Sequence, residues 1–225
     1  SEGGAVAMWT AQRLDQMSHM STRFAASAPL SGPYDLSGTT RQSLLGTAPS
    51  GAQHALRLFL LSYGIYGLHK NQGHRLTEFF KPVMANAVAR AYRTNPTDDD
   101  IIKRLAIAST LMGARNNAEN VLTPRFARAL RTRDTRDPFV RALVQNDVYD
   151  WRPRTPMLLV ALQNDTVVVA KNTQRAMQTM RARGAGKSVL RDSIIRDNNL
   201  NHVTAMPTAL WRARQFFDGG FGNVR

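Results

Sequence analysis

The chain has 225 residues and carries 30 lysines and arginines against 16 aspartates and glutamates, a formal net charge of +14. It contains no cysteine, which excludes disulfides, thiolate catalysis and cysteine-ligated metals. No run of about 18 apolar residues occurs, so the sequence predicts no transmembrane segment. The histidines show no metal-ligand spacing, and we expect neither a metal nor a cofactor. The composition leaves the cellular compartment open.

The basic residues are spread along the chain and form no dense block. Residues 125–131, Arg-Phe-Ala-Arg-Ala-Leu-Arg, mix arginines with apolar residues in the way that is typical of a solvated amphipathic helix. No nucleic-acid-binding motif is recognisable, so we expect no nucleic-acid partner. An arginine surface could steer anionic or membrane-bound substrates, and a basic binding protein without enzymatic activity is one alternative.

The first residues carry a signal for nucleophilic catalysis. Ser1-Glu2-Gly3-Gly4-Ala5 matches the second half of a G-x-S-x-G nucleophile elbow, in which small residues let a strand and a helix approach closely around an exposed serine. Apolar residues at helical spacing follow from Ala5 to Leu14, where the elbow helix would lie. The first glycine of the elbow and the strand before it are absent from this sequence.

Helical patterns dominate the region from Gly38 to Asp150. The helix expected over residues 52–68 is too apolar for a helix with a broad solvent-exposed face, which predicts that it is buried or lines a pocket. Threonines, aspartates and prolines mark the starts of the other helices. These helices are expected at residues 77–92, 101–111 after three aspartates, 125–131 after Thr123-Pro124, and 139–148 after Asp137-Pro138.

The last 75 or so residues predict alternating strands and helices. An apolar run within residues 154–165 suits a buried parallel strand that ends at Asp165. A helix over 171–183, closed by Gly184, and a strand over 187–195 follow. A polar loop then carries His202 and leads into a helical pattern that extends to Phe217.

Ser1, Asp165 and His202 therefore occur in the chain order nucleophile, acid, histidine. The segments S-E-G-G at the start, A-P-L-S-G-P-Y-D-L-S-G at 28–38 and Q-N-D-T-V-V at 163–168 resemble the elbow, a following loop and the acid loop of one family. The chain resembles the C-terminal portion of a serine α/β-hydrolase of the bacterial esterase and secretory lipase type. The resemblance covers residues 1–38 and 151–217.

This resemblance implies an α/β-hydrolase fold in which the chain supplies the C-terminal part of the sheet and a helical cap insertion. Residues 1–37 and 151–225 would form the hydrolase core, and residues 38–150 would form the cap. The N-terminal half of the hydrolase would be a missing segment or a second chain, and we expect the chain alone to be inactive. The resemblance also favours a secreted or periplasmic protein.

The same resemblance assigns roles to single residues. Ser1 would attack the carbonyl of a small-molecule or lipid-like ester, His202 would act as the general base and acid, and Asp165 would orient His202. The backbone N–H of Glu2 would donate one oxyanion-hole hydrogen bond.

Two further groups of residues complete the predicted site. Asp147 and Asp150 precede the strand that ends at Asp165, and they are the reserve candidates for the acid. If the apolar helix over 52–68 roofs the active site, Phe59, Tyr63 and Tyr66 would contact the acyl chain.

Other activities stay open at this point. The same triad serves peptidases and polyester depolymerases, so it predicts the mechanism better than the substrate. An N-terminal-nucleophile hydrolase would use the α-amine of Ser1 as its base, but that class needs strands directly after the nucleophile, whereas a helix is expected here.

Overall fold

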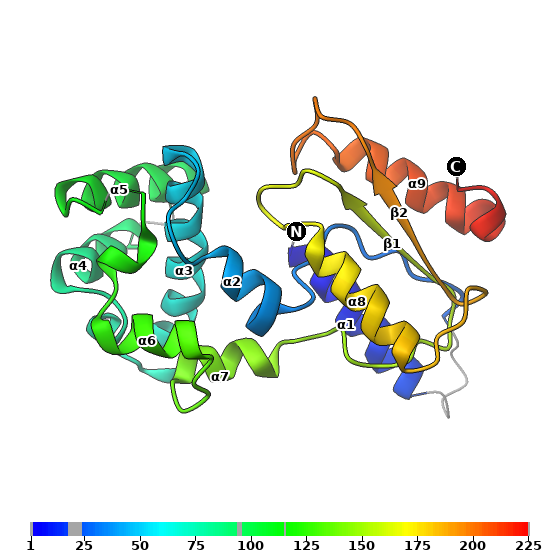
Figure 1. Cartoon of the computed structure of the whole chain (residues 1–225), viewed down its shortest axis with the longest axis horizontal. Coiled ribbons are helices and arrows are strands. Elements are labelled where there is room, and N and C mark those ends of the chain that lie inside the picture. The colour runs from blue at the N-terminus through cyan, green and yellow to red at the C-terminus, as the bar shows by residue number, and fades with distance from the viewer. Residues whose placement is uncertain (1, 18–23, 94–95, 115, 225) are drawn as a thin grey trace. The chain divides into compact units, whose positions relative to one another are not determined.

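The computed structural model describes residues 2–17, 24–93, 96–114 and 116–224. The chain divides into two compact units, one formed by residues 1–40 and 146–225 and the other by residues 41–145 (Figure 1). Each unit has a hydrophobic core of its own residues. The first unit combines a sheet with helices, and the second is helical. That the second unit works as a cap stays a prediction.

The sheet of the first unit is parallel. β1 (Met157–Leu162) pairs with β2 (Leu190–Ile195) in a register that runs from Met157 opposite Leu190 to Leu162 opposite Ile195. On its other side, β1 is joined by parallel bridges to Ser27 and Leu30. All six residues of β1 are buried, because it lies between two neighbours and is covered on both faces.

Helices cover both faces of this sheet. α1 (Glu2–Gln16) and α8 (Lys171–Ala182) pack with Met157 and Leu159 of β1, whereas α9 (Met206–Gly219) packs with Leu158, Val160 and Leu162. Alternate residues of β1 therefore enter two separate cores, as the alternation of side chains along a strand requires. This layered arrangement is the α/β architecture expected from the sequence, and the predicted helices and strands of this unit are confirmed (Figure 1).

Two glycines set the distance between α1 and the loop after the bridged segment. A Cβ on Gly4 would lie 2.2 Å from the carbonyl oxygen of Leu30, and a Cβ on Gly32 would lie 2.6 Å from the backbone nitrogen of Ala5. Real Cβ atoms do not approach backbone this closely, so only glycine fits at both positions. The two glycines thus allow α1 to lie directly against the segment around Leu30 and Gly32.

We expect Gly4→Ala to lower the free energy of unfolding of this unit by roughly 1–3 kcal/mol, because the new methyl group forces α1 away from the sheet. Denaturation followed by tryptophan fluorescence measures this, since Trp9, Trp151 and Trp211, the three tryptophans of the chain, all belong to this unit. Gly186→Ala, where a Cβ meets nothing closer than 3.7 Å, should change the value by less than about 0.5 kcal/mol. Equal stability of both variants would contradict the close approach.

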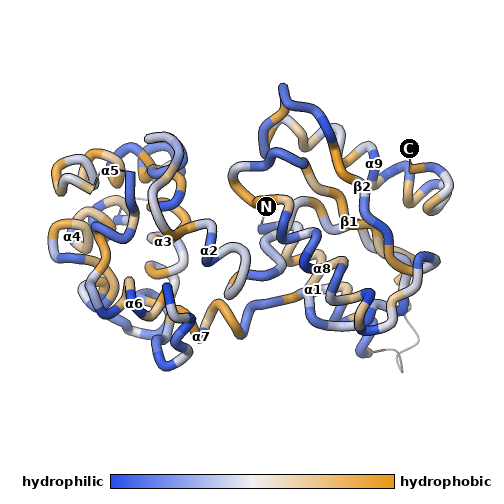
Figure 2. Tube along the Cα trace, viewed as in Figure 1, coloured by the Kyte–Doolittle hydropathy of each residue, from blue (hydrophilic) through white to orange (hydrophobic). Residues whose placement is uncertain are grey.

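The second unit is built from helices around one apolar core. In Figure 2, hydrophobic and hydrophilic residues alternate along these helices. Leu58, Leu61 and Ile65 of the longest helix are buried in this core. The apolar character of the segment 52–68 is therefore explained by packing within the unit. The helices are α2 (Arg41–Ser43), α3 (Gly51–Gln72), α4 (Pro82–Ala91), α5 (Asp98–Leu111), α6 (Pro124–Thr132) and α7 (Pro138–Gln145), with the 3₁₀ turns η2 (Leu76–Glu78) and η3 (Ala118–Val121).

The predicted helix starts in this unit are confirmed where a side chain caps the first turn. Thr97 accepts a hydrogen bond from the backbone N–H of Asp100, and Thr123 accepts one from that of Phe126. The carboxylate of Asp137 likewise accepts from the N–H of Phe139. Each cap satisfies a donor that the helix leaves free.

One helix was predicted with the wrong start. The sequence predicts a helix from Thr77 to Tyr92, but the chain forms the 3₁₀ turn η2, leaves helical geometry at Phe79–Lys81 and begins α4 at Pro82. Proline lacks an N–H and belongs in a first turn. Phe80 instead pairs with Leu122 in an isolated bridge. The helix predicted to reach Val148 also ends earlier, at Gln145.

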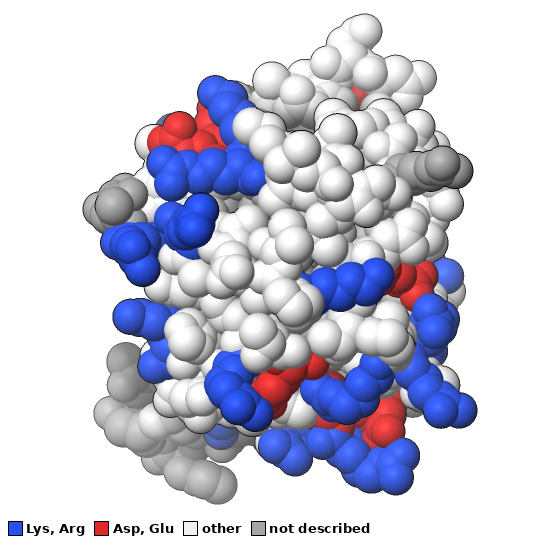
Figure 3. Space-filling view, turned by 90° about the vertical axis from the view of Figure 1, so that its left-hand side faces the viewer, with Lys and Arg blue, Asp and Glu red and all other residues white. Residues whose placement is uncertain are grey.

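Several charged side chains on the helical unit form ion pairs. Arg125 contacts Asp137 at 2.8 Å, Arg131 contacts Glu119, and Arg136 contacts Asp134 at 2.8 Å. Figure 3 shows one face of the molecule, on which basic side chains are separated by uncharged surface and interleaved with acidic ones. The arginines thus lie where solvated helix faces are expected. None of the helices in the described ranges is both long and apolar enough to cross a membrane.

Candidate active site

Asp165 lies in the turn that follows β1. The residue is 5% exposed, and its Oδ1 accepts hydrogen bonds from the backbone N–H groups of Val167 and Val168 at 2.8 and 2.9 Å. These bonds fix the carboxylate and leave Oδ2 for another donor. The position at the carboxyl end of a parallel strand is the one that the sequence predicts.

His202 lies in the loop between β2 and α9. Asn201 holds this loop, because its side-chain oxygen accepts hydrogen bonds from the backbone N–H groups of Val203 and Thr204 at 2.9 and 3.0 Å. The hydroxyl of Thr204 in turn accepts from the N–H of Asn201 at 2.8 Å. This small polar network fixes the backbone on both sides of His202.

The fold brings Asp165 and His202 together across 37 residues of sequence. Nδ1 of His202 lies 2.6 Å from Oδ2 of Asp165, and the two side chains are 14% and 1% exposed. A proton on Nδ1 donates to the carboxylate, which leaves Nε2 as the acceptor. Among the residues that the structure describes, Nε2 has no hydrogen-bond partner. The arrangement can therefore accept and return a proton at Nε2.

The predicted nucleophile, Ser1, lies outside the described residues. The next residue, Glu2, is exposed and begins α1. The first N–H groups of a helix have no partner within the helix, so the N-terminus of α1 offers donors for an oxyanion. The helical course of the chain from Glu2 also departs from the strands that an N-terminal-nucleophile hydrolase needs at this point.

The reserve acids have other partners. Asp147 accepts hydrogen bonds from the backbone N–H and the hydroxyl of Ser37. Asp150 forms a bidentate pair with Arg183 at 2.8 and 2.9 Å, and these hydrogen bonds hold the pKa of the carboxyl below its usual value. Of the three aspartates considered, Asp165 is the one that contacts His202.

The aromatic residues predicted to contact substrate lie on α3. The ring of Tyr66 stacks on Tyr92 with centroids 4.4 Å apart, and Phe59 packs against the core of the helical unit. Burial raises the pKa of Tyr92 to about 12, and its hydroxyl lies 2.9 Å from that of Ser62. Tyr63 is 52% exposed. Tyr63 is therefore the most accessible of the three predicted residues.

Sequence reasoning missed the polar network that supports the acid loop. Asn172, at the start of α8, is 1% exposed, and its side-chain oxygen accepts from the N–H of Asp35 at 3.1 Å. The carboxylate of Asp35 accepts from the backbone N–H groups of Gly38 and Thr39 and from the Thr39 hydroxyl, all within 2.9 Å. The D-L-S-G motif within residues 28–38 could have drawn attention to Asp35. No pattern in the sequence, however, predicts that Asp35 contacts Asn172.

No protein-family model matches the chain, and no curated protein is significantly similar to it in sequence. Solved structures do resemble it. The rice cell wall degrading esterase LipA from Xanthomonas oryzae matches with a TM-score of 0.73 and 23% identity, over 96% of this chain and 56% of the LipA chain. Lipase A from Candida antarctica, in its closed state, matches with a TM-score of 0.57 and 13% identity, over 98% of this chain and 48% of that lipase.

The chain has the α/β-hydrolase fold. It spans about half the length of the two hydrolases that it matches. The hydrogen-bonded pair of Asp165 and His202 lies in the loops that follow the neighbouring parallel strands β1 and β2 of this fold. The fold is therefore the one expected from the sequence.

Proposed function

We propose that this chain carries the catalytic residues of a serine hydrolase that cleaves carboxylic esters through an acyl-enzyme. The observation that carries the proposal is the hydrogen bond of 2.6 Å between Nδ1 of His202 and Oδ2 of Asp165. A buried carboxylate that fixes one imidazole nitrogen and leaves the other as a base is the functional core of a triad. The similarity of the fold to an esterase and a lipase supports ester substrates.

In the proposed mechanism, Oγ of Ser1 attacks the ester carbonyl carbon while Nε2 of His202 accepts the hydroxyl proton. The imidazolium, stabilised by Asp165, returns this proton to the leaving alcohol oxygen, and an acyl-enzyme forms. Water then attacks the acyl carbon and gives its proton to Nε2. Collapse of the second tetrahedral intermediate releases the carboxylic acid and restores the serine hydroxyl.

The developing oxyanion needs donors that are already in place. The backbone N–H of Glu2 is the donor that this chain would supply, because it follows the nucleophile at the N-terminus of α1. A second donor would come from a segment outside this chain. Together, the donors would stabilise the tetrahedral intermediates in both half-reactions.

We further propose that the active enzyme contains an additional hydrolase segment that extends the sheet. In the strand-like segment 27–31, Ser27, Pro29 and Ser31 form the backbone hydrogen bonds to β1. The backbone groups of Ala26 and Ala28, on the opposite edge, have no hydrogen-bond partner within the described ranges. Sheet edges with free N–H and C=O groups accept a further strand.

The surface of α1 supports the same proposal. Val6 and Trp9 on α1 and Met17 directly after it lie at helical spacing and are 54%, 49% and 48% exposed. Exposed apolar side chains in a row are typical of a surface that another part of the protein covers. A segment that pairs with the strand edge would lie beside this helix.

The helical unit is proposed to contribute to substrate choice. If it roofs the site, Tyr63→Ala should shift kcat/KM along a series of p-nitrophenyl esters in a graded way, since one methylene is worth only about 1–3 kcal/mol in an apolar pocket. Tyr66→Ala should mainly destabilise the unit, because its ring stacks on Tyr92. An ester profile for Tyr63→Ala that is parallel to that of the parent would contradict this role.

The function itself is tested by the substrates that the full-length protein cleaves. We expect hydrolysis of p-nitrophenyl esters with a burst of p-nitrophenol, and much slower cleavage of matched p-nitroanilides. A burst equal to the enzyme concentration indicates an acyl-enzyme. Faster cleavage of the anilides would assign the site to a peptidase, and no cleavage of either series would contradict the proposed hydrolase.

A further inference from the structure

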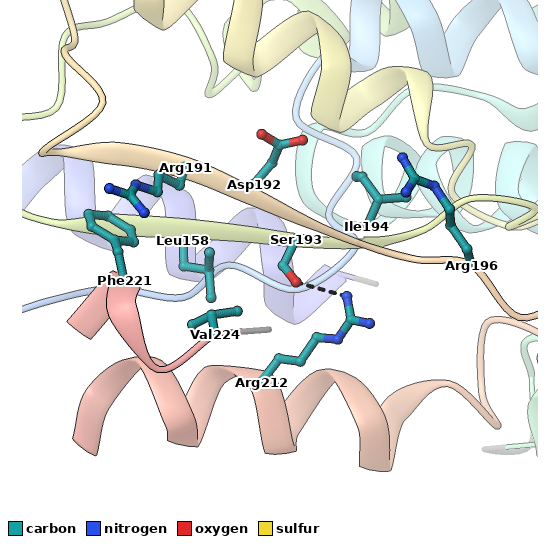
Figure 4. Close-up of a pocket in the computed structure, with 9 residues that line it drawn as sticks. All are labelled: Leu158, Arg191, Asp192, Ser193, Ile194, Arg196, Arg212, Phe221 and Val224. Atoms are coloured by element: carbon teal, nitrogen blue, oxygen red, sulfur yellow. Dashed lines mark hydrogen bonds between the residues drawn. The ribbon is translucent and has the colours of Figure 1, made fainter. Parts of the chain in front are cut away.

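A pocket of about 500 Å³ lies between β2 and α9 (Figure 4). Neither Asp165 nor His202 lines it. Its wall combines the guanidinium groups of Arg191 and Arg212 with the apolar side chains of Leu158, Phe221 and Val224. The pocket is therefore both cationic and apolar.

The hydrophobic pattern of α9 predicts an apolar side chain at the position of Arg212. Ala205 precedes α9, and it lies with Ala209 and Phe216 on the face that packs against the sheet. At 100° per residue, Arg212 falls about 20° from Ala205, at the edge of this face. A long cationic side chain at such a position costs desolvation energy, so its presence needs a compensating interaction.

The hydrogen bonding of Arg212 supplies little of that compensation. Nη1 donates to the hydroxyl of Ser193 at 2.8 Å, and no carboxylate in the described part of the chain pairs with this guanidinium. Partial burial holds the pKa of Arg212 below its usual value. Most of the five donors of the guanidinium are left for solvent or a ligand.

Arg191 lies at the other end of the pocket. Its guanidinium carbon lies 4.8 Å from the centroid of the Phe221 ring, and its Nε donates to the carbonyl of Lys187 at 3.1 Å. Asp192, the next residue, points to the opposite side of β2 in Figure 4 and lies 3.8 Å from Arg181. The pocket therefore has a guanidinium group at each end, and Asp192, which is also among the lining residues, turns its carboxylate to the other face of β2.

We propose that this pocket binds a small organic anion, in which an oxyanion group contacts Arg212 beside Ser193 and an apolar body packs on Leu158, Val224 and Phe221. Guanidinium forks match the geometry of carboxylate and phosphate oxygens and bind them through charge-assisted hydrogen bonds. The volume accommodates a ligand with a single ring. The site is separate from the proposed ester-cleaving residues, and it does not depend on them.

Phenyl phosphate and inorganic phosphate are the probes, with phenol as the uncharged reference. Calorimetric titration of the full-length protein at low salt should give a Kd of about 1 mM or tighter for phenyl phosphate. Inorganic phosphate should bind less tightly, since it cannot use the apolar wall, and phenol should bind least because it lacks the anion.

Arg212→Gln is expected to weaken phenyl phosphate binding at least about tenfold, because a hydrogen bond to a charged group is lost. Arg191→Gln, at the other end of the pocket, should weaken binding by a smaller factor, and it serves as the second variant if Arg212→Gln does not fold. Arg214→Gln is the matched control, since Arg214 is on the same helix and carries the same charge but pairs with Asp218 in solvent.

The proposal is supported if Arg214→Gln keeps the affinity of the parent while either pocket variant loses it. An equal loss in all three variants would show that phenyl phosphate responds only to net charge, and the proposal would fail. It would also fail if the parent does not bind phenyl phosphate, or if inorganic phosphate binds as tightly as phenyl phosphate. Ester hydrolysis is measured separately in each variant and should not change.

Discussion

His202→Ala in the full-length enzyme is expected to lower kcat by about 10⁶-fold while the protein stays folded. The loss is this large because nothing else in the described part of the chain can take the proton of the serine hydroxyl at the same place, and the residual rate comes from binding and the oxyanion donors. Steady-state hydrolysis of a p-nitrophenyl ester measures the change.

His74→Ala is the matched control for this variant. His74 belongs to the helical unit and lies 3.4 Å from Glu78, and we expect its removal to change kcat less than about tenfold. A His202→Ala enzyme with kcat within tenfold of the parent would show that another residue is the base.

Asp165→Asn is expected to lower kcat by about 10⁴-fold. The amide can still accept from Val167 and Val168 through its oxygen, so the turn and the fold should persist. Its NH₂ group would face Nδ1 of His202 in place of a carboxylate oxygen, which favours the tautomer with the proton on Nε2. An imidazole in that tautomer cannot act as the base.

The two reserve acids provide the comparison for Asp165→Asn. Asp150→Asn disrupts a half-exposed pair with Arg183, which is worth at most about 1 kcal/mol of stability. It should therefore leave kcat nearly unchanged, and Asp147→Asn should do the same. Losses of similar size from Asp150→Asn and Asp165→Asn would contradict the choice of the acid loop.

The positions of Asp165 and His202 in loops after strands could be predicted from the sequence because the relevant signals are local and simple. Asp165 follows a continuous apolar run, and His202 lies between a strand pattern and a helix pattern. Parallel strands bring their carboxyl ends to one edge of a sheet, so two loops that follow such strands can meet. The resemblance to serine hydrolases implied a contact between these two loops across 37 residues, and the structure brings Nδ1 of His202 within 2.6 Å of Oδ2 of Asp165.

Other features depend on tertiary contacts that produce no periodic pattern in the sequence. The break in helical geometry at Phe79–Lys81 reflects burial of Phe79 and Phe80 and the pairing of Phe80 with Leu122, which is distant in sequence. The bond from Asp35 to Asn172 spans 137 residues. Arg212 would be assigned to a solvated face from its charge alone, yet it lies at the edge of the packed face of α9. The type of a side chain predicts its burial least well where a charged side chain, such as that of Arg212, is partly buried.

The identity of the nucleophile is the central claim, and covalent labelling tests it directly. A fluorophosphonate ester phosphorylates the serine that a triad activates, and peptide mass spectrometry of the labelled full-length enzyme locates the modified residue. We predict one label per molecule, on Ser1, that is abolished in His202→Ala and retained in His74→Ala. A label on another serine, or labelling of Ser1 that is unaffected by His202→Ala, would contradict the proposed triad.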